Sequence, residues 1–197
     1  MHTIDLGPYV DDPGYEAARH LDSTDPLAEF STRFAPTDPG LIYLDGNSLG
    51  RPPVAAASRI TRVVEHEWAS RLIRSWPERW WQQADRIGDS LAELIGASPD
   101  EVIVADSTSV ALFKLTLGAL QARSGRTRVV TDDVNFPTDN YVTAAAAQLA
   151  GCDITTVPSP DGIEGPADGL IAALDESTAL LTLSHVLFKS GYLYDME

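Results

Sequence analysis

The feature that most constrains the fold is a regular alternation of short apolar runs and helical segments between residues 101 and 183. Runs rich in β-branched and other apolar residues, the pattern of buried strands, occur at 101–105, 128–131, 154–157 and 179–183. Apolar or alanine-rich helical segments separate them, at 109–122, 138–150 and 167–174. Parallel strands joined by helices are covered on both faces, so they contain continuous apolar runs. The sequence therefore predicts an α/β fold with a mainly parallel sheet and flanking helices.

Residues before 101 follow another pattern. Short helical stretches are expected at 14–21 and 27–34, and a short apolar run at 41–44 predicts a strand that ends at a Gly-Asn turn. Two amphipathic helices are expected next, from Ile60 to Leu72 and from Trp80 to Ile95. The tryptophans of this region are either an aromatic wall for a substrate or helix packing: Trp68, Trp76, Trp80 and Trp81.

Composition and charge exclude several classes of protein. The net charge is −15, from 29 acidic and 14 basic side chains, so nucleic acid and anionic membranes are not expected partners. No apolar run approaches the roughly 20 residues that cross a bilayer. No secretory signal pattern opens the chain, and Cys152 is the single cysteine, so a cytoplasmic location is expected. The four histidines are scattered, and no metal site is predicted.

Three polar segments follow predicted strands, where open α/β sheets bind their ligands. The first, at 106–109, contains hydroxyl side chains at the start of a helix. Free N–H groups and hydroxyls at such a position can hold a phosphate. The alternative is that Ser107 or Thr108 is simply the N-cap.

The second and third segments also allow two interpretations each. At 135–139, Asn135 can cap a helix that begins with Pro137, or Phe136 and Asp139 can face a flat cationic ligand. After the last predicted strand, His185 is either a proton carrier or a hydrogen-bonded structural residue.

Taken in order, the motifs resemble those of kynureninases. The similar segments are Ile-Tyr-Leu-Asp-Gly-Asn-Ser-Leu-Gly at 42–50, Leu-Ile-Arg-Ser-Trp at 72–76, Asp-Ser-Thr-Ser at 106–109, Asn-Phe-Pro-Thr-Asp at 135–139, and Ser-His-Val to Lys-Ser-Gly-Tyr at 184–192. The resemblance runs from about residue 26 to the last residue. Cysteine desulfurases share the Tyr-Leu-Asp opening but do not characteristically continue it with Gly-Asn-Ser-Leu-Gly.

The resemblance implies the large domain of the aspartate-aminotransferase type (fold type I) and a homodimer. It implies a carbon–carbon hydrolase that uses pyridoxal 5'-phosphate. The reaction converts L-kynurenine (or 3-hydroxykynurenine) to anthranilate (or 3-hydroxyanthranilate) and L-alanine. It belongs to tryptophan catabolism, the kynurenine pathway and NAD biosynthesis. The cofactor acts as an electron sink.

The resemblance also implies roles for individual residues. Thr108 and Ser109 would contact the cofactor phosphate, Phe136 would lie against the pyridine ring, and Asp139 would add negative potential near the ring nitrogen. Pro137, Thr138 and Ser184 would line the same pocket. Asn47 and Ser48 would lie near the substrate.

One element of the family is missing from the 197 residues. The Schiff-base lysine lies in a Ser-x-Lys-Tyr segment after an Asp-x-Ala-His strand, and neither motif is present. Lys114 and Lys189 do not match it. The chain is therefore interpreted as an N-terminal portion that is inactive by itself. Residues 1–50 would form an arm and strand with small-domain or dimer contacts, and 51–197 the first part of the cofactor-binding large domain. The alternative is a non-catalytic truncated product or pseudoenzyme that binds a phosphate ligand or a partner chain.

Overall fold

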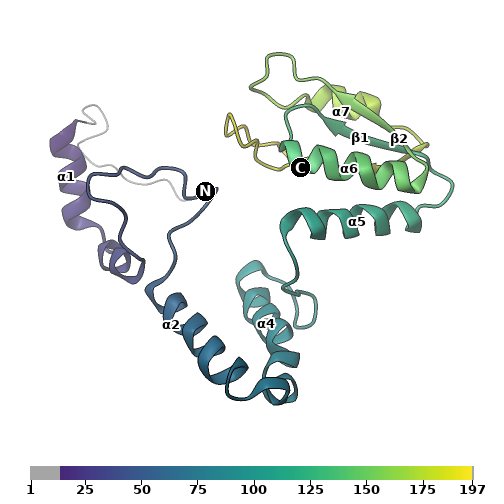
Figure 1. The fold of residues 1–197 in the computed structure, drawn as a ribbon. Coiled ribbons are helices and arrows are strands. Elements are labelled where there is room, and N and C mark those ends of the chain that lie inside the picture. Colours follow the sequence, from purple (N-terminus) through teal and green to yellow (C-terminus); the bar gives the residue numbers. More distant parts are fainter. Residues whose placement is uncertain (1–13, 197) are drawn as a thin grey trace. The chain divides into compact units, whose positions relative to one another are not determined.

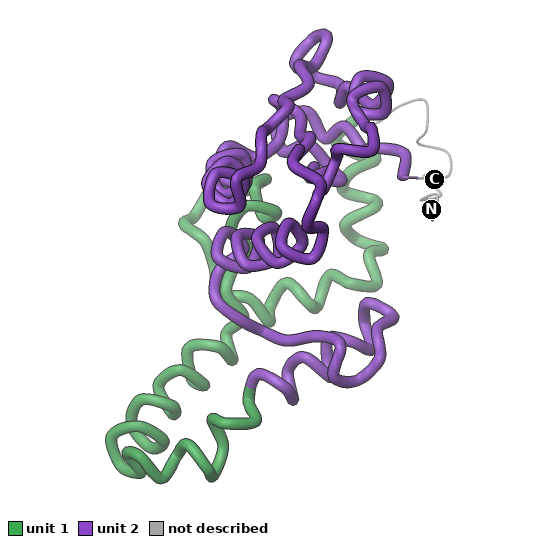
Figure 2. The backbone as a smooth tube through the Cα atoms, turned by 90° about the vertical axis from the view of Figure 1, so that its right-hand side faces the viewer, with its two compact units in different colours: residues 1–83 green, residues 84–197 purple. Residues whose placement is uncertain are grey.

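The computed structural model describes residues 14–196 and divides into two compact units, with the boundary between Gln83 and Ala84 (Figure 2). Each unit is described by itself. The sequence predicted a different boundary, at residue 50, between an N-terminal arm and the large domain of the family. That boundary stays a prediction.

Within the described residues, the regular elements of the first unit are all helices, and residues 34–53 form no helix. Its elements are α1 (Tyr15–Thr24), the 3₁₀-helix η2 (Ala28–Arg33), α2 (Val54–Arg62), the π-helix η3 (Val63–Trp68), the 3₁₀-helix η4 (Leu72–Arg74), α3 (Ser75–Glu78) and the 3₁₀-helix η5 (Trp80–Gln82). The predicted helical stretches are confirmed, although the helix expected up to Leu72 breaks into π and 3₁₀ turns. The strand predicted at 41–44 is wrong. This run has no regular secondary structure and pairs with no strand among the described residues, and Ile42 is 82% exposed.

The second unit alternates helices and strands (Figure 1). Its elements are α4 (Gln83–Ile95), α5 (Thr108–Ala122), β1 (Arg128–Asp132), α6 (Pro137–Ala150), β2 (Asp153–Val157), α7 (Ala167–Ala173) and β3 (Thr178–Leu181). The strand predicted at 101–105 is wrong, because these residues have no strand partner within the described part of the chain. They pass close to α4 instead. A Cβ at Gly88 would lie 1.9 Å from the Val102 carbonyl oxygen, so the helix needs glycine there.

The sheet is parallel, with the strand order β2-β1-β3. The central strand β1 is buried along its length, because Val129 and Val130 point to opposite faces and each has no exposed surface. Val129 packs with Leu120 of α5 and Ala147 of α6. Val130 packs on the other face with Leu170 of α7 and with residues of the C-terminal segment. The predicted parallel sheet with helices on both faces is confirmed.

Candidate binding site at the carboxyl ends of the strands

The first predicted segment leads into α5. Ser107 is the N-cap, and its hydroxyl accepts a hydrogen bond from the Val110 N–H at 3.4 Å, which confirms the capping interpretation. The cap leaves the N–H groups of Thr108 and Ser109 without an acceptor among the described residues. A capped helix with two free N–H groups and two adjacent hydroxyls can hold an anion. The capping and phosphate interpretations are therefore compatible.

The second segment connects β1 to α6. Phe136, not Asn135, occupies the N-cap position, and Pro137 is the first residue of the helix. The amide oxygen of Asn135 instead accepts from the Phe136 N–H at 2.8 Å. The capping interpretation for Asn135 is therefore wrong, because this side chain holds the loop and not the helix end.

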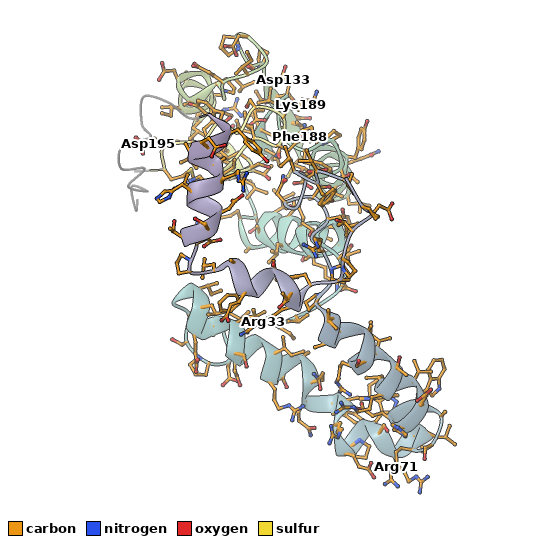
Figure 3. All side chains as sticks on the ribbon, turned by 90° about the vertical axis from the view of Figure 1, so that its left-hand side faces the viewer. Arg33, Arg71, Asp133, Phe188, Lys189 and Asp195 are labelled. Atoms are coloured by element: carbon orange, nitrogen blue, oxygen red, sulfur yellow. The ribbon has the colours of Figure 1, made fainter. Side chains whose placement is uncertain are left out.

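The third segment contacts the second through its side chains. The Ser184 hydroxyl donates to the same Asn135 amide oxygen at 2.5 Å, and Asn135 is only 4% exposed. The Phe136 ring also meets the Phe188 ring edge to face, with centroids 5.0 Å apart. Phe188 and Lys189 lie beside Asp133, on the connection from β1 (Figure 3). The segments that follow β1 and β3 thus form one polar surface.

The first segment reaches this surface through the packing of α5 against α6. Both helices begin at the same end and run side by side (Figure 1). A crevice between them is lined by Ser109 on α5 and by Tyr141 on α6, two residues beyond Asp139. The hydroxyl-rich start of α5 and the start of α6 therefore lie on the same side of the sheet.

The Asp139 carboxylate places a negative charge on this surface that no described side chain balances. Burial raises the pKa of the Asp139 carboxyl above its ordinary value. No described side chain forms an ion pair or a hydrogen bond with this carboxylate. A cation placed near it would therefore gain a charge partner that the protein does not supply.

A buried hydrogen-bonded pair, Tyr194 and Asp132, lies below this polar surface and was not predicted from the sequence. The Tyr194 hydroxyl donates to the Asp132 carboxylate at 2.8 Å, and Asp132 also accepts from the Val134 N–H at 3.0 Å. Asp132 is fully buried, and Tyr194 is 4% exposed. The pair holds the C-terminal segment against the end of β1. Sixty-two positions separate the two residues, and no local pattern connects them.

We expect Tyr194→Phe to lower the free energy of unfolding by about 1.5–3 kcal/mol at neutral pH, because a buried carboxylate oxygen loses its donor. Burial and the Asp132 contact raise the Tyr194 pKa. The unfolded tyrosine ionises near pH 10 while the folded one stays protonated, so the unchanged chain loses stability above that pH. Urea unfolding followed by circular dichroism should show the difference between the two chains narrowing above pH 10. A difference that stays constant would contradict this assignment.

The remaining predicted residues have separate positions. Asn47 and Ser48 belong to the first unit, and their role near a substrate stays a prediction. His185 is exposed and lines an apolar hollow beside β3, together with Leu115 and Leu181. Lys114 pairs with Asp106, and the Lys189 ammonium lies 5.7 Å from the centroid of the Phe188 ring.

Two classes of site have no support in residues 14–196. No described group of His, Cys, Asp and Glu side chains can hold a metal ion. Among the same residues, no helix has the length and apolar character needed to span a bilayer.

The fold matches a known enzyme structure. A C-DES variant, solved with glycine covalently linked to its PLP cofactor, aligns with 79% of this chain and 40% of its own chain. The TM-score is 0.64 and the sequence identity 19%. The second unit therefore has the α/β architecture of fold type I PLP-dependent enzymes.

Sequence comparison identifies relatives that share one name. The chain is 41% identical over 184 residues to a kynureninase of Pseudomonas fluorescens and 44% identical over 186 residues to one of Burkholderia mallei. These alignments cover 90% and 92% of the chain but 42% and 43% of the relatives, so the chain spans less than half of their length. No protein-family model matches it. Over nine tenths of its length, the chain is a homologue of the kynureninases.

Proposed function

We propose that this chain provides the phosphate- and ring-binding part of a kynureninase-like enzyme that uses pyridoxal 5'-phosphate. The observation that carries the proposal is the common location of two elements. The N–H groups at the start of α5 and the Asp139 carboxylate at the start of α6 lie on the same side of the sheet, and neither has a partner within residues 14–196. A phosphorylated pyridinium needs an anion site and a carboxylate within the length of one small molecule.

The side chains present fit the two ends of this ligand. Thr108 and Ser109 would bind the phosphate through their N–H groups and hydroxyls, where the positive end of the α5 dipole adds attraction. Phe136, 45% exposed, offers a ring face for stacking. Asp139 would add negative potential near the ring nitrogen, and Pro137, Thr138 and Ser184 would line the pocket.

The homologues support the reaction class. We propose hydrolysis of L-kynurenine or its 3-hydroxy form to the matching anthranilate and L-alanine, in tryptophan catabolism and NAD biosynthesis. The cofactor supplies an electron sink for the carbanion that forms. The part of this chain is to bind the phosphate, orient the ring and add negative potential near its nitrogen. We further propose a cytoplasmic homodimer, with Asn47 and Ser48 near the substrate.

Recognition of the phosphate distinguishes the proposed site from a surface that binds aromatic molecules in general. We expect the chain to bind pyridoxal phosphate at least about tenfold more tightly than pyridoxal, since charge-assisted hydrogen bonds contribute about 1.5–3 kcal/mol each. Equilibrium dialysis with both compounds, detected by absorbance, measures the ratio. Equal affinities would contradict the phosphate site.

The alternative of a non-catalytic phosphate binder makes a different prediction in the same experiment. A site for phosphate alone would bind inorganic phosphate and pyridoxal phosphate with similar affinity. The proposed site gains additional affinity from Phe136 and Asp139. Inorganic phosphate that competes as well as the complete cofactor would favour the non-catalytic alternative.

A further inference from the structure

The chain turns back on itself after β3, between residues 186 and 193. The two ends of this 186–193 turn form an antiparallel bridge, and the Leu187 N–H donates to the Tyr192 carbonyl oxygen at 2.9 Å. The Gly191 N–H donates to the Leu187 carbonyl oxygen, also at 2.9 Å, with φ = 71° at Gly191. Glycine adopts this left-handed conformation without steric cost. Backbone hydrogen bonds therefore give the turn a defined shape.

Two buried side chains anchor the 186–193 turn to the sheet. Leu187, 2% exposed, packs in the core with residues of β1 and α7. Directly after the turn, the buried Tyr194 hydroxyl donates to the Asp132 carboxylate at the end of β1. Because Leu187 is fixed in the core, the backbone of the adjacent Phe188 is fixed on the surface above it.

The backbone of Phe136, on the connection from β1 to α6, is fixed as well. Its φ and ψ are −60° and 132°, the extended conformation that a residue before proline prefers. Its N–H donates to the Asn135 amide oxygen at 2.8 Å, and Pro137 begins α6 directly after it. These contacts hold the main chain. They do not set the two side-chain torsions that orient the Phe136 ring.

Phe188 supplies a contact to the ring itself. The centroids of the Phe136 and Phe188 rings lie 5.0 Å apart, and the ring planes are inclined by 72°. This edge-to-face arrangement is one of the geometries that aromatic pairs prefer. It favours one orientation of the Phe136 ring over the others that its torsions allow. Phe136 remains 45% exposed, so part of its ring is accessible to a ligand.

We infer that Phe188 is a positioning residue, which holds the Phe136 ring in the orientation that stacks on a pyridine ring. A ring that is oriented before the ligand binds loses less side-chain entropy on binding, and the affinity rises accordingly. Phe188 acts through Phe136 and does not contact the ligand. The inference rests on the proposed function, because it requires a flat ligand on Phe136. It adds a residue that the sequence did not place in the site.

A double-mutant cycle tests this inference. Equilibrium dialysis measures pyridoxal phosphate binding to the unchanged chain, to Phe188→Leu, to Phe136→Leu and to the chain with both changes. We expect Phe188→Leu alone to weaken binding about three- to tenfold, the range that one aromatic pair contributes. In the Phe136→Leu chain, the same change should alter the affinity by less than about twofold, because the ring that Phe188 orients is gone.

Two further variants separate positioning from a general effect on the fold. Phe188→Tyr keeps an aromatic ring and should bind the cofactor nearly as tightly as the unchanged chain. At saturating cofactor, the circular dichroism induced in the cofactor's absorption band should be markedly weaker with Phe188→Leu and restored with Phe188→Tyr. Phe30→Leu is the matched control: it makes the same change at a ring of similar exposure, 39% against 44%, in the first unit. It should leave affinity and induced signal unchanged.

The outcomes distinguish this inference from the proposed function. If Phe188→Leu binds the cofactor as tightly as the unchanged chain, the inference is overturned and the cofactor site stands. Equal losses with and without the Phe136 ring would show that Phe188 contacts the ligand itself or supports the fold in general, and would also overturn it. A chain that does not bind pyridoxal phosphate, or that binds it equally well after Phe136→Leu, overturns both the proposed ring site and the inference.

Discussion

A Thr108→Pro chain is expected to bind pyridoxal phosphate about tenfold or more weakly than a Thr108→Val chain. Both substitutions remove the hydroxyl, but only proline also removes the N–H group. One charge-assisted hydrogen bond contributes about 1.5–3 kcal/mol, which corresponds to roughly 10- to 100-fold in affinity. The comparison therefore isolates the backbone donor at the start of α5.

The position tolerates proline, which makes the comparison clean. Thr108 is the first residue of α5, where proline is favoured. The preceding Ser107 has an extended backbone, with ψ = 164°, as a residue before proline prefers. Circular dichroism should show the same helix content in both variants. Equal affinities in two folded variants would mean that the phosphate lies elsewhere.

The second large effect concerns the two lysines. We expect the isolated 197-residue chain to release no anthranilate and to give no borohydride-reduced cofactor adduct on Lys114 or Lys189. The Lys114 ammonium forms an ion pair with Asp106, and this contact would have to break before the amine could reach an aldehyde. Lys189 is exposed and lies over the Phe188 ring, and no hydrogen bond or ion pair with a described residue fixes the position of its amine.

Mass spectrometry of the reduced and digested chain checks this prediction. A matched Lys114→Arg/Lys189→Arg chain keeps both charges and cannot form an adduct at either position. It should bind the cofactor as tightly as the unchanged chain. A stoichiometric adduct on either lysine of the unchanged chain, lost in the arginine chain, would contradict the prediction.

The sequence predicted the parallel sheet because the β1, β2 and β3 runs are rich in β-branched and apolar residues and are separated by apolar or alanine-rich helical segments. It failed at 41–44 and 101–105, where the same apolar signal occurs without a partner strand. An isolated apolar run carries no information about pairing, because hydrogen bonds to a neighbouring strand decide whether it becomes a strand. Ile42 and Val104 are exposed in the structure for this reason.

The candidate site was predicted only in part. Pro137 and Ser184 follow strands in the sequence, so their location at the carboxyl end of the sheet could be expected. Ser107 follows the run at 101–105, which is not a strand, so its location depends on where α5 begins. The shared contact of Ser184 and Phe136 with the Asn135 amide could not, because it depends on side chains brought together by the fold. The same holds for Tyr194 and Asp132, which meet only once α7 and the last segment have packed on the sheet.

Anthranilate release from a completed enzyme would show that this chain binds the cofactor for a kynureninase reaction. The complete chain is mixed, or joined in one polypeptide, with the part of the Pseudomonas fluorescens kynureninase that it does not cover. Kynurenine and pyridoxal phosphate are then added, and anthranilate is followed by its fluorescence. We expect anthranilate release from the assembled protein, and markedly less when Thr108→Pro is introduced. A folded assembly that binds the cofactor but releases no anthranilate would contradict it.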